Sequence, residues 1–195
     1  MIPHYHDFTA TDSVKLPSVY YVGRQEKDVI KRLKANRIEM IKIKSDTMVD
    51  LGIFRVLKYD TPNKPYEGHF YLSNPVIQRE IQSVHLKKGD WEIRCNQANA
   101  LYLHSVLQPE AEDSYFTWNF FDSYLQQKEY FSSYVFIDKI DDILKNNPTL
   151  RKKYKTKLKE DSSFRESEWD QLYFIYKNSP YFEKTYNVLP VFYQD

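Results

Sequence analysis

The sequence contains one cysteine, Cys95, and four glycines among its 195 residues. A single cysteine excludes a disulfide within the chain and leaves the redox compartment open. We interpret Cys95 as a small buried apolar residue, because no neighbouring base is assigned that would make it a nucleophile. The sequence also lacks a phosphate-binding glycine loop, a Gly-x-Ser-x-Gly elbow and a His-Glu-x-x-His zinc motif. These absences argue against most common catalytic designs.

An excess of charge of one sign is also missing. Lysine and arginine number 28 against 27 for aspartate and glutamate, so the net charge is +1. Nothing in this balance attracts nucleic acid or an anionic membrane globally, and we expect no nucleic-acid partner. No apolar run reaches the roughly 18 residues of a membrane span, and the start lacks a signal-peptide pattern. We expect any export signal to lie outside this sequence.

Aromatic residues are abundant, with 17 tyrosines and 12 phenylalanines. Such side chains supply large buried areas and are enriched at recognition surfaces, and we expect most of them in the core. The length suits one domain with a sizeable core. We predict an N-terminal arm or linker over residues 1–16 and a single domain over residues 17–195.

Strand and helix patterns alternate at the start of this domain. Val29, Ile30 and Leu33 share one face of a helix predicted over residues 25–36. Strand patterns flank that helix at residues 18–22 and 38–44. The sequence therefore predicts an opening strand-helix-strand unit.

Short strands separated by turn residues follow up to Cys95. Lys87-Lys88-Gly89-Asp90 predicts a four-residue hairpin turn between strands at residues 76–86 and 91–95. Pro62 and Pro65 predict a loop, since proline disrupts a central strand. Antiparallel pairing into a sandwich-like sheet is the expected result. Two further strands are predicted at residues 54–59 and 69–72.

The C-terminal third is predicted to be mostly helical, which makes the fold class α+β. The amphipathic helix predicted over residues 98–106 precedes this third, and we expect its face with Leu101 and Tyr102 to pack towards the sheet. Pro190 indicates that the final strand lies at a sheet edge. The predicted elements are helices over residues 98–106, 114–127, 137–146, 150–161 and 164–179, a strand at 133–136 and the edge strand at 188–193.

An acidic group, Glu110, Glu112 and Asp113, lies where the β-rich and helix-rich halves meet. These carboxylates would suit calcium or a general acid and base, but their spacing does not match a calcium-binding loop. We favour a structural interpretation, in which Asp113 or Ser114 caps the following helix.

The segment Tyr66-Glu67-Gly68-His69 is the second candidate site. Glu67 and His69 lie two residues apart beside a glycine that permits an unusual backbone conformation. A strand start with a hydrogen-bonded histidine is the plainer interpretation. With Pro62 and Pro65, Tyr66, Glu67 and His69 form our candidate interface, since loops on rigid sheets commonly carry recognition.

Three potential metal ligands lie in the predicted arm. His4 and His6 would face the same side of an extended chain, with Asp7 beside them. An adventitious zinc or nickel site is one interpretation. We favour a solvated arm, because three ligands in a flexible segment do not make a formed catalytic site.

Several short motifs, in order, resemble the region that follows the catalytic domain in bacterial zinc carboxypeptidases related to carboxypeptidase A. The similarity spans about residues 17–193. It is carried by Tyr66-Glu67-Gly68-His69, Gly89-Asp90-Trp91, Gln97, Leu107-Gln108-Pro109-Glu110, Asp113-Ser114, Trp118-Asn119-Phe120-Phe121, Tyr130-Phe131-Ser132-Ser133-Tyr134-Val135-Phe136 and Tyr181-Phe182-Glu183.

The zinc-binding residues of that family are not carried by this sequence. The family binds zinc through a His-x-x-Glu pair and a later histidine, and no histidine here is followed by glutamate three positions later. The resemblance therefore implies a non-catalytic C-terminal accessory domain that docks on or orients a peptidase domain on its N-terminal side. That enzyme domain would hold the zinc, and the whole protein would be periplasmic or secreted.

Two other functions stay open at this point. One is a binding module for carbohydrate or cell-wall peptide, which requires surface aromatics on a concave face. The other is an independent hydrolase built on Glu67, His69 and Glu110.

Overall fold

The computed structural model describes residue 9 and residues 13–195, and these fall into two compact units. Unit 1 holds the described residues up to Leu125 together with Asn187–Asp195, and unit 2 is Gln126–Tyr186. This division differs from the single domain predicted over residues 17–195. Its physical reason is that unit 2 has an apolar core of its own. The predicted arm and its histidines lie mostly outside the described residues, and His4, His6 and Asp7 do so entirely.

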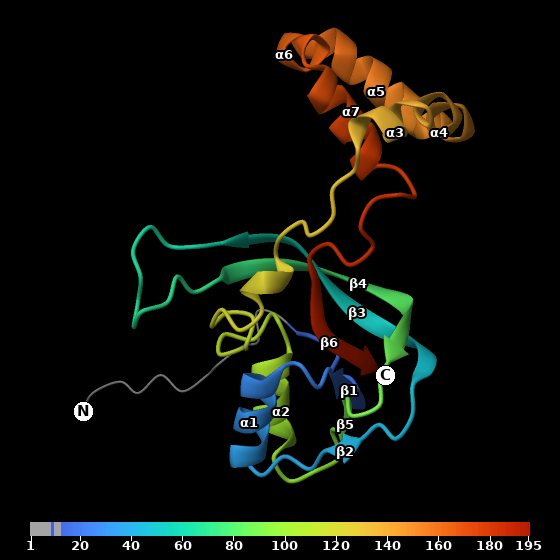
Figure 1. The fold of residues 1–195 in the computed structure, drawn as a ribbon. Coiled ribbons are helices and arrows are strands. Elements are labelled where there is room, and N and C mark those ends of the chain that lie inside the picture. The colour runs from blue at the N-terminus through green and yellow to red at the C-terminus, as the bar shows by residue number, and fades with distance from the viewer. Residues whose placement is uncertain (1–8, 10–12) are drawn as a thin grey trace, which may run out of the picture. The chain divides into compact units, whose positions relative to one another are not determined.

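Six strands form one antiparallel sheet in the described part of unit 1 (Figure 1). Their order is β2-β5-β1-β6-β3-β4. Together with helices concentrated in the C-terminal third, this sheet confirms the predicted α+β class. The expected sandwich-like arrangement takes the form of one bent sheet. The strands are β1 (Val19–Val22), β2 (Ile41–Lys42), β3 (Thr47–Asp60), β4 (Ser73–Leu86), β5 (Trp91–Arg94) and β6 (Val188–Gln194).

A long two-stranded ribbon is responsible for the bend. The register of β3 with β4 continues into β2 with β5, where Lys42 faces Trp91. Residues 43–46 and 87–90 interrupt the two strands between these pairings, and Gly89 there has a φ of +96°. On either side of the interruption the ribbon pairs with different strands: β3 pairs with β6, and β5 pairs with β1. The hairpin predicted at residues 87–90 is therefore wrong, since these residues bend the ribbon and leave β4 and β5 unpaired with each other.

The last strand, β6, lies inside the sheet between β1 and β3, whereas we predicted an edge strand. The prediction rested on Pro190, which has no backbone N–H to donate. Pairing with β1 ends at Val191, and pairing with β3 is irregular between Val188 and Phe192. Pro190 occupies the gap in both ladders, so a central position costs no hydrogen bond.

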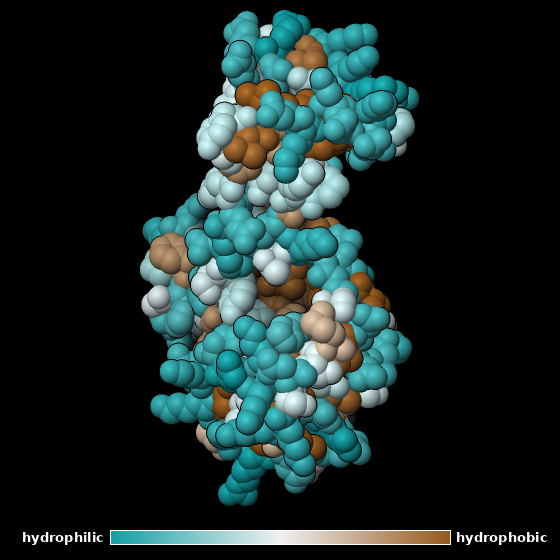
Figure 2. Space-filling view, turned by 45° about the vertical axis from the view of Figure 1, so that its right-hand side comes forward, coloured by the Kyte–Doolittle hydropathy of each residue, from teal (hydrophilic) through white to brown (hydrophobic). Residues whose placement is uncertain are grey.

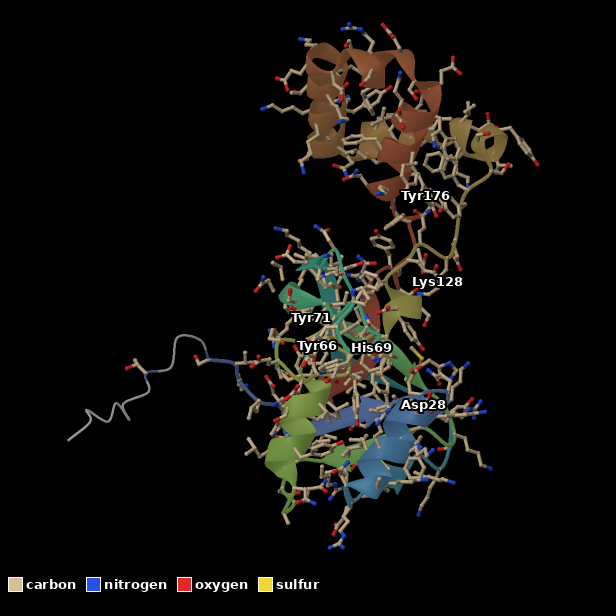
Figure 3. The ribbon with its side chains drawn as sticks, turned by 90° about the vertical axis from the view of Figure 1, so that its left-hand side faces the viewer. Asp28, Tyr66, His69, Tyr71, Lys128 and Tyr176 are labelled. Carbon is tan, nitrogen blue, oxygen red and sulfur yellow. The ribbon has the colours of Figure 1, made fainter. Side chains whose placement is uncertain are left out.

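Helix α1 (Lys27–Ala35) completes the predicted strand-helix-strand opening and buries the predicted face. It lies beside helix α2 (Ala100–Leu107) in Figures 1 and 3. The Asn99 side-chain amide donates to the Asn36 carbonyl at 2.9 Å, which joins the end of one helix to the start of the other. Both helices contribute to the core of unit 1.

The buried face of α2 differs from the prediction. Leu103 is fully buried, whereas Leu101 is 80% exposed and Tyr102 is half-buried. Leucine and valine at positions 103, 106 and 107 form a second stripe of helical spacing, and this more apolar stripe packs against the core.

Residues 114–121 form turns, and the helix predicted over residues 114–127 is absent from this described segment apart from a short 3-10 helix, η1 (Asp122–Tyr124). The left-handed backbone of Asn119, with a φ of +66°, prevents a continuous helix. The Ser114 hydroxyl accepts the Thr117 N–H at 3.1 Å, as a helix cap does, but only turns follow it. The irregular chain allows three aromatic side chains to enter the core: Tyr115, Phe116 and Phe121.

Unit 2 is helical, as predicted for this part of the chain. Its predicted strand at residues 133–136 is wrong, because these residues form a helix whose Phe136 packs on Phe131 and Tyr176 with ring centroids 4.9 and 5.6 Å away. Three of the helices begin at side-chain caps. The helices are α3 (Ser133–Ile137), α4 (Ile140–Asn146), α5 (Pro148–Glu160), α6 (Ser162–Glu166) and α7 (Glu168–Lys177).

A buried carboxylate joins the beginning and end of unit 2. The Glu183 side chain accepts hydrogen bonds from the Lys128 N–H at 2.8 Å, the Glu129 N–H at 3.2 Å and the Thr185 hydroxyl at 2.9 Å. Burial alone would raise the pKa of Glu183, but these hydrogen bonds together with the Lys128 charge lower it below its ordinary value of 4.5.

Candidate functional site

Residues 61–72 connect β3 to β4 and carry most of the candidate interface; we call them the aromatic loop. Tyr66 and His69 exchange backbone hydrogen bonds of 2.8 and 2.9 Å. The two residues between them, Glu67 and Gly68, have φ angles of +48° and +82°. This is the backbone of a tight two-residue hairpin turn, and Gly68 adopts it without steric cost. The strand predicted at residues 69–72 is wrong, because the paired strand begins at Ser73.

The rings of the aromatic loop pack on Trp118. The Tyr66 ring lies 6.5 Å from both Trp118 and Tyr71, and the His69 ring lies 5.7 Å from Trp118 in an edge-on arrangement. Figure 3 shows Tyr66, His69 and Tyr71 close together on unit 1. Tyr66 is nevertheless 57% exposed and Phe70 is 50% exposed. The loop therefore presents Tyr66 and Phe70 to solvent, and the Tyr66 ring packs on the rings of Tyr71 and Trp118.

Asn119 anchors the loop by its side chain. Its amide nitrogen donates to the Phe70 carbonyl at 3.0 Å and to the Asp122 carboxylate at 3.3 Å. Its amide oxygen lies 3.2 Å from His69 Nδ1. Burial raises the pKa of Asp122, while the hydrogen bond from Asn119 and the nearby His69 oppose that rise. Asparagine suits this position, because it tolerates the left-handed backbone and supplies both a donor and an acceptor.

The predicted interface residues lie together on this loop, and they lie at the surface. Tyr66, Glu67, His69 and Pro65 are exposed and Pro62 is half-buried. Tyr66 and His69 therefore do not belong to the core of unit 1. On the face drawn in Figure 2, apolar side chains reach the surface as brown areas among hydrophilic ones. Sequence reasoning missed the exposed ring of Phe70 and the anchoring role of the Asn119 side chain, which depends on tertiary contacts.

The residues proposed for a hydrolase do not form one group. His69 lines two shallow cavities of about 620 and 410 Å³, with Asn119 in both, and Glu110 lines neither. Glu110 instead forms an ion pair with Arg79 at 2.7 Å and lines a separate cavity. Glu67 and His69 form no side-chain hydrogen bond with each other, since the His69 ring contacts Asn119 and Trp118.

The acidic trio is divided in the same way. Glu110 pairs with Arg79, Asp113 accepts the Trp118 indole N–H at 3.4 Å, and Glu112 is exposed. Ser114, one of the two predicted caps, accepts the Thr117 N–H, but the predicted helix is absent and the bond closes a turn. Within residue 9 and residues 13–195, no three His, Cys, Asp or Glu side chains are grouped to hold a metal ion.

Two further expectations from the sequence concern the environment of Cys95 and membrane-spanning helices. Cys95 is buried, and burial raises the pKa of its thiol to about 11, as suits a small apolar residue. Among the described residues no helix is both long and apolar enough to cross a membrane.

Comparisons with known proteins add nothing to this geometry. No family model matches the chain, and neither a curated protein nor a solved structure matches it.

Proposed function

We propose that unit 1 is a non-catalytic docking module of a zinc carboxypeptidase-like protein. In this proposal the aromatic loop contacts the peptidase domain on the N-terminal side and orients it. The peptidase domain would hold the zinc and perform the hydrolysis, and the protein would work in the periplasm or outside the cell.

The observation that carries the docking proposal is an exposed apolar surface with a fixed conformation. Tyr66 and Phe70 are half or more exposed, yet Trp118 and Asn119 hold their loop in place. Aromatic side chains of this kind are enriched at interfaces, because they bury much area and lose little conformational entropy. Interfaces between domains of one chain typically bury roughly 600–1,500 Å². The aromatic loop and the surface residues beside it would together supply this area.

The carboxypeptidase assignment rests on the ordered motifs of the sequence, several of which contribute to this surface. Tyr66-Glu67-Gly68-His69 forms the turn, and Trp118-Asn119 forms the support beneath it. The zinc ligands of the family have no counterpart in the sequence, so we assign this chain no peptidase activity.

A binding experiment tests the docking surface. The polypeptide encoded immediately upstream of Met1 is expressed separately and titrated with this chain. Tyr66→Ala and Phe70→Ala should each weaken binding about ten-fold or more, as central aromatic anchors do. Tyr134→Ala serves as the matched control, because Tyr134 is a 77% exposed tyrosine of unit 2.

Three results would contradict the proposal. The upstream polypeptide could lack a zinc peptidase domain, the two loop variants could bind as tightly as the wild type, or Tyr134→Ala could weaken binding as much as they do. The non-catalytic assignment has its own test: this chain, stripped of metal and reloaded with zinc, should cleave no C-terminal residue from peptides. Stoichiometric zinc together with peptidase turnover would refute it.

A further inference from the structure

A groove of about 980 Å³ on unit 1 shares no residue with the aromatic loop or with the acidic trio. Helix α1 forms one wall of it with Lys27, Lys31 and Lys34. The chain at and just after β2 forms a second wall with Lys42 and Lys44. All five lysines are exposed. We call this surface the basic groove.

The floor of the basic groove is apolar. Ile30 is buried there, and Ile43 and Trp91 are half-buried. Lys34 Nζ lies 4.8 Å and Lys42 Nζ lies 5.3 Å from the centroid of the Trp91 ring, so both walls contact this indole. The groove therefore combines an apolar floor with a cationic rim.

The positive charges of the rim are unpaired. Seven basic residues line the groove, Arg24 and Lys88 among them, whereas no acidic residue of the described part of the chain does. None of the seven forms an ion pair with a described carboxylate. Glu92 pairs instead with Arg94 at 2.9 Å. Asp46 accepts the backbone N–H of Lys88 at 2.8 Å and does not line the groove. Like charges gathered in this way repel one another, and an anionic ligand relieves the repulsion.

The spacing of the rim lysines matches that of an extended peptide. Lys27, Lys31 and Lys34 follow one another at about 4.5–6 Å along the axis of α1. Lys42 and Lys44 are two residues apart in the chain, which is about 7 Å when the backbone is extended. An extended peptide presents every second side chain on the same side, again at intervals of about 7 Å. Carboxylates on alternate residues of such a peptide therefore reach the ammonium groups, while the residues between them face the floor.

We propose that the basic groove binds an acidic peptide in an extended conformation, with glutamate or aspartate at alternate positions and apolar residues between them. The carboxylates pair with the lysines of both walls, and the apolar side chains pack on Trp91 and Ile43. The proposal is independent of the docking function, because the groove lies outside the aromatic loop.

Single-stranded nucleic acid also carries a regular row of negative charges, and it is the main rival. Its bases bind proteins by stacking on aromatic side chains. A peptide is favoured, because the ammonium groups of Lys34 and Lys42 already lie against the Trp91 ring. The apolar floor also suits aliphatic side chains, which nucleic acid lacks.

The test is a titration of a fluorescein-labelled peptide of alternating glutamate and leucine with the full chain, followed by fluorescence anisotropy at low ionic strength. The peptide should bind saturably, and added salt should weaken the binding because it screens exposed charges. A peptide with glycine in place of leucine should bind about ten-fold more weakly, since it leaves the apolar floor uncovered.

A double charge reversal tests the rim. Lys31→Glu combined with Lys44→Glu changes one cation of each wall and leaves the contacts of Trp91 intact, and it should weaken peptide binding about ten-fold or more. Lys152→Glu combined with Lys155→Glu is the matched control, because it makes the same change of net charge at two exposed lysines of α5. The control should bind as the wild type does. Thermal unfolding checks that both variants fold, and Lys31→Gln with Lys44→Gln replaces the reversal if it does not.

Each other outcome overturns the proposal. Absence of saturable peptide binding leaves the groove a solvated surface. An equal loss of affinity in the control variant shows a response to net charge alone. Equal affinity of the leucine and glycine peptides shows that the floor takes no part. Tighter binding of a labelled thymidine oligonucleotide than of the peptide, lost in Lys31→Glu with Lys44→Glu, assigns the groove to nucleic acid.

Discussion

Replacing Asn119 by glycine is expected to loosen the aromatic loop while the core of unit 1 stays folded. The Asn119 side chain contacts the Phe70 carbonyl at 3.0 Å, His69 Nδ1 at 3.2 Å and the Asp122 carboxylate at 3.3 Å. A hydrogen bond contributes a net of about 0.5–1.5 kcal/mol, and a half-buried residue such as Asn119 belongs at the low end. We expect the free energy of unfolding of unit 1 to fall by about 1–2 kcal/mol.

Comparing alanine with glycine at position 119 separates the effect of the lost side chain from the effect of the left-handed backbone. Asn119→Ala removes the same hydrogen bonds and also strains the left-handed conformation, which has a φ of +66°. The alanine variant should be less stable than the glycine variant by about 1 kcal/mol, after the greater unfolded-state entropy of glycine is counted. Denaturant unfolding followed by hydrogen exchange measures this, because peptides of the two units are resolved separately.

The exchange pattern matters as much as the stability. Residues 61–72 should exchange faster in Asn119→Gly, whereas β1 and β6 should exchange as in the wild type. Equal stability of the glycine and alanine variants, or unchanged exchange in the loop, would show that Asn119 is not the anchor.

Three further changes test the packing and electrostatics. Phe121→Ala should cost about 3–5 kcal/mol because Phe121 is 1% exposed, and Trp118→Ala, at a partly exposed position, should cost clearly less. Equal denaturant midpoints of the two variants would contradict this. Gly52→Ala should cost about 1–3 kcal/mol, since a Cβ there overlaps the Tyr193 ring; a wild-type melting temperature would contradict it. The lowered pKa of Glu183 stabilises unit 2 above pH 4.5, and this contribution is lost as the pH falls through the folded-state pKa. Glu183→Gln should therefore be less stable than the wild type at pH 7, and the difference in their free energies of unfolding should shrink in acid. A pH-independent difference would refute the assignment.

The sequence predicted elements well where a single periodicity dominates. The opening strand-helix-strand unit and the helical C-terminal third have clear apolar stripes, such as Val29, Ile30 and Leu33. It failed where tertiary contacts override a local rule. Pro190 suggested an edge strand, but gaps in two ladders accept it inside the sheet. The aromatic run after Ser114 suggested a helix, but Asn119 reverses the backbone.

Properties that depend on distant residues were beyond sequence reasoning. The turn at Tyr66 could be anticipated from Glu67-Gly68, but its support by Asn119 could not, because about fifty positions separate the partners. The net charge of +1 likewise conceals a groove of about 980 Å³ whose wall gathers basic side chains from three parts of unit 1 around Trp91. Global composition describes no local surface of this kind. That groove is lined by Arg24, Lys27, Lys31, Lys34, Lys42, Lys44 and Lys88, with Ile30, Ile43 and Gly89.

Hydrogen exchange of the aromatic loop, measured in this chain alone and in a polypeptide extended through the peptidase domain that we propose lies upstream, tests the docking proposal most directly. Docking through Tyr66 and Phe70 predicts slower exchange across residues 61–72 in the longer polypeptide, with no change in the buried strand β1. Unchanged exchange across residues 61–72, with protection appearing elsewhere on unit 1 or nowhere, would contradict it.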